Sequence, residues 1–166
     1  MKKCIILQIN YLILICLFIP CVAIAQPICQ IQRFSAYNGL AQRSVTNILQ
    51  DSKGFIWFST WNGLNKFDGY TFKNYKAFPG DGCTLTSNRL AKITQTQTCD
   101  IWCQTYDLRI YLFDSRREKF IDILRPYENE KQQTYAVQNV YTLPKGVSWI
   151  VCDRGAFRID KKKKKK

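Results

Sequence analysis

A repeat centred on tryptophan constrains this chain more than any other feature of its sequence. Each copy has an aliphatic residue, a tryptophan nine positions later, and an apolar residue followed by aspartate about ten positions after that. The copies are Ile48, Trp57 and Phe67-Asp68; Ile93, Trp102 and Phe113-Asp114; Val140, Trp149 and Ile159-Asp160. The tryptophans are 45 and 47 residues apart. A fixed period of about 40 to 50 residues is typical of repeat architectures whose units cannot bury their apolar faces alone.

Strand-like segments fill the first unit, residues 44–78. They are residues 44–49, 55–60, 64–67 and 70–75. Residues 55–58 are apolar at every position, which indicates a strand covered on both faces. Gly54, Asn62-Gly63 and Asp68-Gly69 lie between these segments, and such residues favour tight turns because glycine tolerates positive φ. Short antiparallel strands joined by tight turns predict one blade of a β-propeller, which has four strands.

The remaining units are less regular. The second, residues 88–125, has Cys99 and Leu108 where the first unit has turn glycines, and the third, residues 137–160, lacks a fourth strand. Residues 26–43 form an N-terminal segment in which residues 33–37 resemble the outer strand that closes a propeller. Polar connectors follow the first two blades at residues 79–88 and 125–136. We therefore predict an all-β fold, an incomplete β-propeller of about two and a half to three four-stranded antiparallel blades.

The two ends of the chain differ from its middle. Residues 1–25 have a basic start, an apolar stretch and an Ala-Ile-Ala sequence, which predicts a cleavable signal peptide and a periplasmic product; an uncleaved membrane anchor is the alternative. Residues 161–166 are all lysine. We interpret this tail as the product of a truncated reading frame, the alternative being a basic tail for nucleic acid or anionic membrane. Residues 26–160 carry +5 of the formal +13 charge, so we predict no nucleic-acid partner.

The cysteines and the lack of histidine bear on disulfide formation, metal binding and phosphoryl transfer. The cysteines after the signal peptide are Cys29, Cys83, Cys99, Cys103 and Cys152. An odd count without paired spacing is not a disulfide framework, and Cys99 and Cys103 on one strand would lie about 13 Å apart. We expect small buried thiols, no metal site and no cofactor. The chain has no histidine, so it cannot itself carry a phosphohistidine.

The first unit resembles a known family. Residues 34–40 read FSAYNGL, residues 44–60 read SVTNILQDSKGFIWFST and residues 62–70 read NGLNKFDGY. Together they are similar to the start of two-component regulator propeller proteins, the periplasmic sensor halves of Bacteroides-type hybrid two-component systems. The resemblance implies a parent with seven-bladed propellers, a membrane helix, a histidine kinase and a DNA-binding domain, and with oligosaccharides as signals. It implies that this chain is a truncated, non-enzymatic part of that parent. The remaining blades, the kinase and the C-terminal region that links the parent to the membrane are missing from it.

The repeated residues are best interpreted as scaffold. Trp57, Trp102 and Trp149 could stack on sugar rings, but their position within apolar strands favours core packing. Asp68, Asp114 and Asp160 could be catalytic carboxylates, but their recurrence at a turn position favours hydrogen bonding within the turn. Asp51, Gly54 and Trp57 have the spacing of the turn found in sialidase-like propellers, which leaves a propeller glycosidase or lyase as an alternative.

Candidate ligand contacts lie in the loops. Trp61, Tyr106 and Arg154 follow the second strands of the three units, and Arg43 precedes the first strand of the first unit. Aromatic faces and a guanidinium at one end of the blades suit a sugar that bears an acidic group. We therefore predict an oligosaccharide-sensing region whose parent regulates polysaccharide-utilisation transcription. A secreted glycan-binding module and a non-functional gene fragment are the alternatives.

Overall fold

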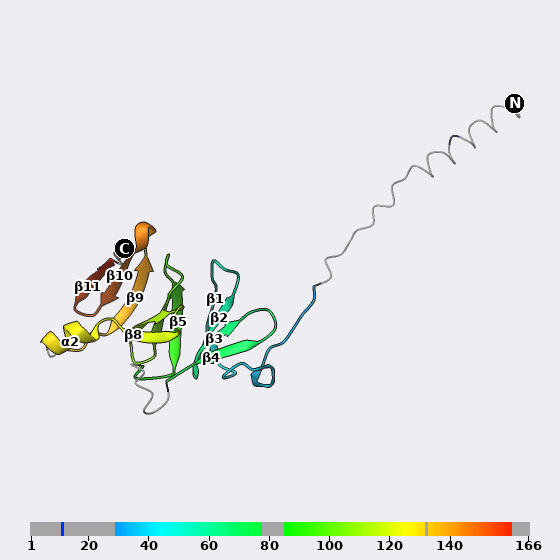
Figure 1. Cartoon of the computed structure of the whole chain (residues 1–166), viewed down its shortest axis with the longest axis horizontal. Helices are drawn as coiled ribbons and strands as arrows, with labels where there is room; N and C mark the ends of the chain where they lie inside the picture. The colour runs from blue at the N-terminus through cyan, green and yellow to red at the C-terminus, as the bar shows by residue number, and fades with distance from the viewer. Residues whose placement is uncertain (1–10, 12–28, 78–84, 132, 161–166) are drawn as a thin grey trace, which may run out of the picture. The chain divides into compact units, whose positions relative to one another are not determined.

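The computed structural model describes residue 11 and residues 29–77, 85–131 and 133–160 (Figure 1). Chain contacts divide the molecule into residues 1–32 and residues 33–166, and the fold belongs to the second unit. Apart from Tyr11, the predicted signal peptide lies outside the described residues, as do the lysine tail and most of the 79–88 connector. No helix in the described ranges is long and apolar enough to cross a bilayer.

Three antiparallel sheets follow one another along the chain (Figure 1). Blade 1 consists of β1 (Val45–Gln50), β2 (Ile56–Thr60), β3 (Gly63–Phe67) and β4 (Phe72–Tyr75). Blade 2 consists of β5 (Leu90–Gln95), β6 (Ile101–Thr105), β7 (Ile110–Asp114) and β8 (Lys119–Asp122). Blade 3 consists of β9 (Val137–Thr142), β10 (Val147–Cys152) and β11 (Gly155–Asp160). Each blade is a meander in which consecutive strands pair, so the predicted all-β architecture of incomplete propeller type is confirmed.

The turns of blade 2 repeat those of blade 1 without its glycines. Gly54 and Gly63 have φ of 89° and 98°, and their counterparts Cys99 and Leu108 have φ of 63° and 60°. Left-handed backbone costs a non-glycine residue about 1–2 kcal/mol, so blade 2 keeps these turns against local preference. Blade 2 packs against blade 1 on one face and against blade 3 on the other.

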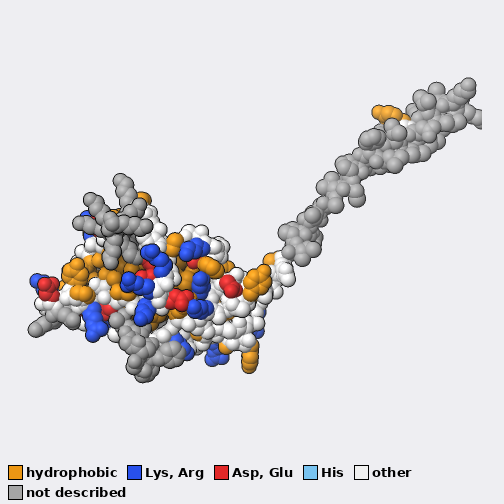
Figure 2. Space-filling view, viewed as in Figure 1, with side chains coloured by type: hydrophobic (Ala, Val, Ile, Leu, Met, Phe, Trp, Pro, Cys, Tyr) orange, Lys and Arg blue, Asp and Glu red, His pale blue; other side chains and the backbone are white. Residues whose placement is uncertain are grey.

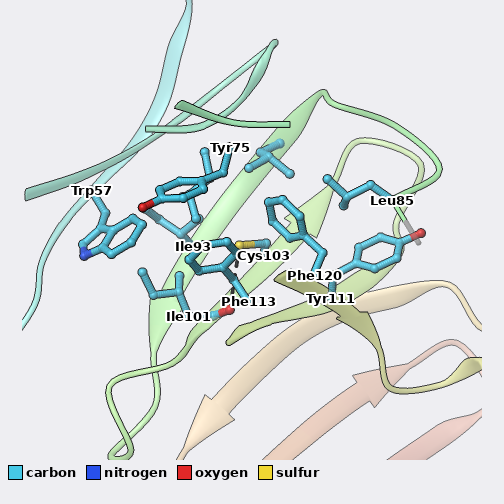
Figure 3. Packing of buried hydrophobic residues seen from close by; sticks show 11 residues of the cluster. Trp57, Tyr75, Leu85, Ile93, Ile101, Cys103, Tyr111, Phe113 and Phe120 are labelled. Atoms are coloured by element: carbon cyan, nitrogen blue, oxygen red, sulfur yellow. Dashed lines mark hydrogen bonds between the residues drawn. The ribbon is translucent and has the colours of Figure 1, made fainter. Parts of the chain in front are cut away.

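Aromatic and aliphatic side chains fill the space between blades 1 and 2 (Figure 3). Trp57 and Tyr75 of blade 1 both pack on Phe113 of blade 2, with ring centroids 5.7 Å and 4.7 Å away. A second cluster joins Trp102 of blade 2 to Val140 and Ile150 of blade 3. The first strands β1, β5 and β9 are neighbours, so they form the inner side of the array.

The tryptophans differ in how fully they are buried. Trp57 and Trp102 are each 2% exposed, which confirms the core-packing prediction for both, whereas Trp149 is 37% exposed. The prediction is wrong for Trp149 because, within the described residues, no further sheet covers that side of blade 3. The indole N–H of Trp57 donates to Asp51 Oδ2 at 2.8 Å, and that of Trp102 donates to Ser148 Oγ at 3.2 Å.

Two segments depart from the predicted pattern. Residues 33–37 do not form a strand: a 3-10 turn, η1 (Ala36–Asn38), occupies their end, because the Asn38 side chain accepts hydrogen bonds from the backbone and hydroxyl of Ser35. The 125–136 connector contains a helix, α2 (Arg125–Lys131). Glu128 of α2 forms an ion pair with Arg109 of blade 2, with 2.6 Å between Oε2 and Nη2. This pair fixes α2 against blade 2. A second 3-10 turn, η2 (Pro144–Gly146), joins β9 to β10.

Candidate ligand-binding face

One end of the blades presents the turn between the second and third strands beside the loop that enters the next blade. Backbone bonds tie these turns together: Gly63 N donates to Asn88 O at 2.8 Å and Tyr106 N donates to Arg89 O at 3.0 Å. The Asn88 side chain in turn holds the backbone of Ala77 in both directions, at 2.8 Å and 3.0 Å. The loop before β5 is therefore hydrogen-bonded to a turn of blade 1 and to a turn of blade 2.

Gly63 permits this close approach. A Cβ atom at Gly63 would overlap the backbone carbonyl of Tyr75, and the residue has φ of 98°. Both observations require glycine there. The glycine predicted from the Asn-Gly turn thus serves contact between strands as well as turn geometry.

Three exposed side chains lie close together around this loop, and we call them the Trp61–Arg89–Tyr106 cluster. The Trp61 and Tyr106 rings are 6.1 Å apart and nearly perpendicular, at 88°. The Arg89 guanidinium carbon lies 5.6 Å from the Trp61 ring. Trp61 is 44% and Tyr106 is 54% exposed, so both offer ring surface to solvent on a backbone that is held in place.

The charge of Arg89 is available for a ligand. None of the ion pairs found among the described residues involves Arg89, whereas Arg109, Arg117, Arg154 and Arg158 each pair with a carboxylate. The neighbouring turn residue Asp107 accepts a hydrogen bond from Thr86 at 2.8 Å. Burial acts to raise the pKa of Asp107, but hydrogen bonds from Thr105 and Thr86 bring it below its ordinary value. Asp107 is therefore ionised at neutral pH.

The predicted site residues fare differently. Trp61 and Tyr106 are brought together, but Arg154 is not their equivalent: Asp153 N donates to Ala136 O as Tyr106 N does to Arg89 O, which places Asp153 at the matching position. Arg154 pairs with that aspartate at 3.6 Å. Arg43 is exposed in the loop before β1, and among the described residues it makes no ring contact or ion pair with the cluster.

Sequence reasoning missed Arg89. Its counterpart in blade 1 is Ser44, so the repeat drew attention to no residue there. The available signal was its position directly before the first strand of blade 2, the same type of loop that singled out Arg43. Arg89 lies over Trp61 because blade 2 packs against blade 1. No local motif in the sequence indicates this contact.

The repeated aspartates have structural roles. Asp68 accepts from the backbone of Tyr70 and Thr71 at 2.8 Å and 2.7 Å, and Asp114 accepts from Arg116 N at 2.9 Å. Asp160 pairs with Arg158 at 3.2 Å.

Cys103 and Cys152 are buried as expected, whereas Cys99 is half-buried and Cys29 is exposed. The described cysteines are unpaired, and burial raises the pKa of the Cys103 thiol well above its ordinary value. No cluster of metal-ligating side chains occurs in the described ranges.

A recess between blades 2 and 3 is a weaker candidate. It is lined by Lys92, Thr94, Trp102, Gln104, Ile110 and Val140. Lys92 donates to Asn139 Oδ1 at 3.0 Å and Gln104 donates to Val137 O at 2.6 Å. These polar groups already join blade 2 to blade 3. On the face shown in Figure 2, basic and acidic side chains are interspersed.

Comparison with known proteins identifies the family to which the first blade is similar. Residues 39–62 match the model of the family described as two component regulator propeller. A segment of 53 residues is 47% identical to Histidine kinase P4 of Formosa agariphila, covering 32% of this chain and 4% of that protein. The resemblance recognised in the sequence is thus confirmed for the first blade.

Solved structures extend the likeness to the other blades. The chain is similar to the extracellular domain of the hybrid two component system BT3049 from B. thetaiotaomicron, with a TM-score of 0.64 and 27% identity over 78% of this chain and 19% of that one. The extracellular domain of BT4673 from the same organism matches with a TM-score of 0.51 and 25% identity, over 72% and 17%. The chain therefore resembles an extracellular domain of a hybrid two-component system and not a catalytic one, and it spans a small part of each relative.

Proposed function

We propose that this chain is a ligand-sensing propeller region of a hybrid two-component sensor, located in the periplasm, and that its ligand is an oligosaccharide. The family match in blade 1 and the likeness to extracellular domains support the sensor role. The Trp61–Arg89–Tyr106 cluster supports the ligand class. Exposed aromatic rings stack on the apolar faces of sugars. Arg89 has no carboxylate partner among the described residues, so its guanidinium could donate to hydroxyl or carboxylate oxygens.

The perpendicular rings carry the proposal. Trp61 and Tyr106 come from different blades and lie 6.1 Å apart, while backbone bonds from Gly63 and Tyr106 fix the loop between them. A rigid pair of rings loses little conformational freedom when a ligand binds, which favours affinity. In the parent sensor the histidine kinase, which this chain without histidine cannot replace, would report the binding event.

Tryptophan fluorescence tests the proposal directly. The purified chain is titrated with neutral and uronic-acid-containing oligosaccharides, and Trp61→Ala and Tyr106→Ala are compared with the parent. We expect saturable binding of at least one oligosaccharide and about a tenfold loss of affinity in each variant, equivalent to about 1.4 kcal/mol.

The control is Tyr70→Ala. Tyr70 is 92% exposed and lies in the turn between β3 and β4, at the opposite end of blade 1 from Trp61. This variant should bind as the parent does. Equal affinity in all variants would reject the cluster as the site, and release of shorter sugars during the titration would favour the glycosidase or lyase alternative.

A further inference from the structure

Arg89 combines a fixed backbone with an exposed side chain. Its amide N–H donates to Ser87 Oγ at 3.1 Å, and its carbonyl oxygen accepts from Tyr106 N at 3.0 Å. The side chain lies at the surface, in the loop before β5. The base of the arginine is therefore held in place while its guanidinium is open to solvent.

The repeat shows that the backbone does not require an arginine at this position. In blade 1 the equivalent bond joins Trp61 N to the carbonyl oxygen of Ser44 at 3.3 Å, and in blade 3 it joins Asp153 N to that of Ala136 at 3.0 Å. Short side chains thus occupy the position in both neighbouring blades. The long cationic side chain of blade 2 therefore contributes something other than the geometry of the loop.

The guanidinium lies beside the ring surface that a sugar would contact. Its carbon is 5.6 Å from the Trp61 ring, which is within the range of a cation–π contact. A guanidinium that packs on an aromatic ring keeps the N–H donors at its edge free for planar acceptors. A carboxylate accepts two parallel hydrogen bonds from such an edge, which gives the pair both strength and a defined orientation.

The acidic residue of the neighbouring turn does not neutralise Arg89. Asp107 follows Tyr106 in the turn between β6 and β7, and its carboxylate accepts from Thr86 Oγ1 at 2.8 Å. No ion pair joins Asp107 to Arg89 within the part of the chain that the structure describes. A negatively charged ligand group is repelled by Asp107 and attracted by Arg89, and this combination directs it toward Trp61.

We propose that Arg89 selects an acidic sugar: its guanidinium donates to the carboxylate of a uronic acid residue whose ring packs on Trp61. This inference rests on the proposed function, in which the Trp61–Arg89–Tyr106 cluster binds an oligosaccharide. Arg89 is then the residue that distinguishes uronic acids from neutral sugars of the same shape. The aromatic rings contribute to the binding of both, because stacking on a sugar ring does not require a charge.

Matched ligands test the charge preference without any change to the protein. Calorimetry on the purified chain compares uronic acid oligosaccharides (oligogalacturonate, alginate and hyaluronan fragments) with their methyl esters, which keep the sugar rings and lose the charge. We expect at least one acid to bind about tenfold more tightly than its ester. Equal affinities would overturn the selection of acidic sugars and leave the proposed function standing, whereas no binding of any sugar would overturn both.

The Arg89→Gln variant tests whether this arginine is responsible. It should bind the acid about tenfold more weakly than the parent and bind the ester as the parent does. Arg116→Gln removes the same charge from an exposed residue in the turn between β7 and β8, at the opposite end of blade 2, and should leave both affinities unchanged. An equal loss for acid and ester in Arg89→Gln would show a structural role only and overturn the proposal.

Salt and a second anion complete the test on the unmodified chain. The affinity for the acid should fall as the salt concentration rises, because exposed charge pairs are screened, while the affinity for the ester should stay constant. The same salt dependence for both would overturn the proposal. Tighter binding of a sulfated neutral oligosaccharide than of any uronic acid would overturn the assignment of a carboxylate as the selected group.

Discussion

At the residue scale, Asp51 holds the first turn of blade 1 to its core. One carboxylate oxygen accepts from the backbone of Lys53 and Phe55 at 2.9 Å and 3.0 Å, and the other accepts from the Trp57 indole at 2.8 Å. The residue is 8% exposed. Thr96 accepts the turn bonds in blade 2, where the Trp102 indole has Ser148 of blade 3 as its partner.

Replacing Asp51 by alanine should lower the free energy of unfolding by about 1–3 kcal/mol, because the buried Trp57 indole N–H is left without an acceptor. Urea denaturation followed by tryptophan fluorescence measures the change. Asp68→Ala is the matched control, since Asp68 makes the same kind of turn bonds on an exposed residue and should cost less. A cost for Asp51→Ala no larger than that of the control would contradict this role.

Residue by residue, the candidate site shows where sequence reasoning stops. Trp61 and Tyr106 could be predicted because the repeat places both after a second strand. Arg154 lies in the corresponding turn between β10 and β11, as predicted. It comes one position after Asp153, which is the equivalent of Trp61 and Tyr106. Arg89 could not be found from the repeat, since its place over Trp61 depends on how two blades pack.

At the element scale, Glu118 joins the two complete blades. It lies in the turn between β7 and β8 and accepts from Lys73 Nζ at 2.7 Å and from Tyr75 Oη at 2.9 Å, both in β4. The hydrogen bonds from Lys73 and Tyr75 lower the pKa of Glu118 below its ordinary value. Burial and the same contact raise the pKa of Tyr75.

A lowered pKa means that the folded chain favours ionised Glu118. Its contribution is complete above the pKa of glutamate in the unfolded chain and is lost as pH falls through the lower pKa of the folded chain. The Glu118→Gln variant should therefore have a lower free energy of unfolding than the parent near neutral pH. On acidification its free energy of unfolding should fall less than that of the parent. Urea midpoints measured from neutral to acid pH test this, and parallel pH profiles would contradict it.

The strands were predictable because their information is local. Apolar residues and turn glycines place β1 to β4 within a few residues of the predicted segments. Residues 33–37 were not predicted correctly because the Asn38 side chain bonds to Ser35 and favours a 3-10 turn over a strand. The helix α2 was missed because Glu128 pairs with Arg109, which is distant in sequence. Trp149 shows the same limit, since its repeat position predicts burial that only a neighbouring sheet can provide.

At the scale of the whole molecule, stability should vary from blade to blade. In repeat proteins each unit is stabilised by its neighbours, and blade 2 is covered by Trp57 on one side and by the β9–β10 cluster on the other. Hydrogen exchange should be slowest in β6 and β7 and faster in β10 and β11. Uniform exchange, or slowest exchange in blade 3, would contradict this order.

The hydrogen bonds from two turns to the loop before β5 couple ligand binding to the interface between blades 1 and 2. A ligand that touches both Trp61 and Tyr106 bridges the seam between the first two blades, so part of its binding energy resists their separation. This coupling is reciprocal. If protonation of Glu118, at the other end of the interface between the blades, lowers the affinity for the ligand, then the ligand opposes protonation of Glu118 by the same coupling free energy. The proposed ligand-binding face would thus bind its ligand more tightly when blades 1 and 2 are held together.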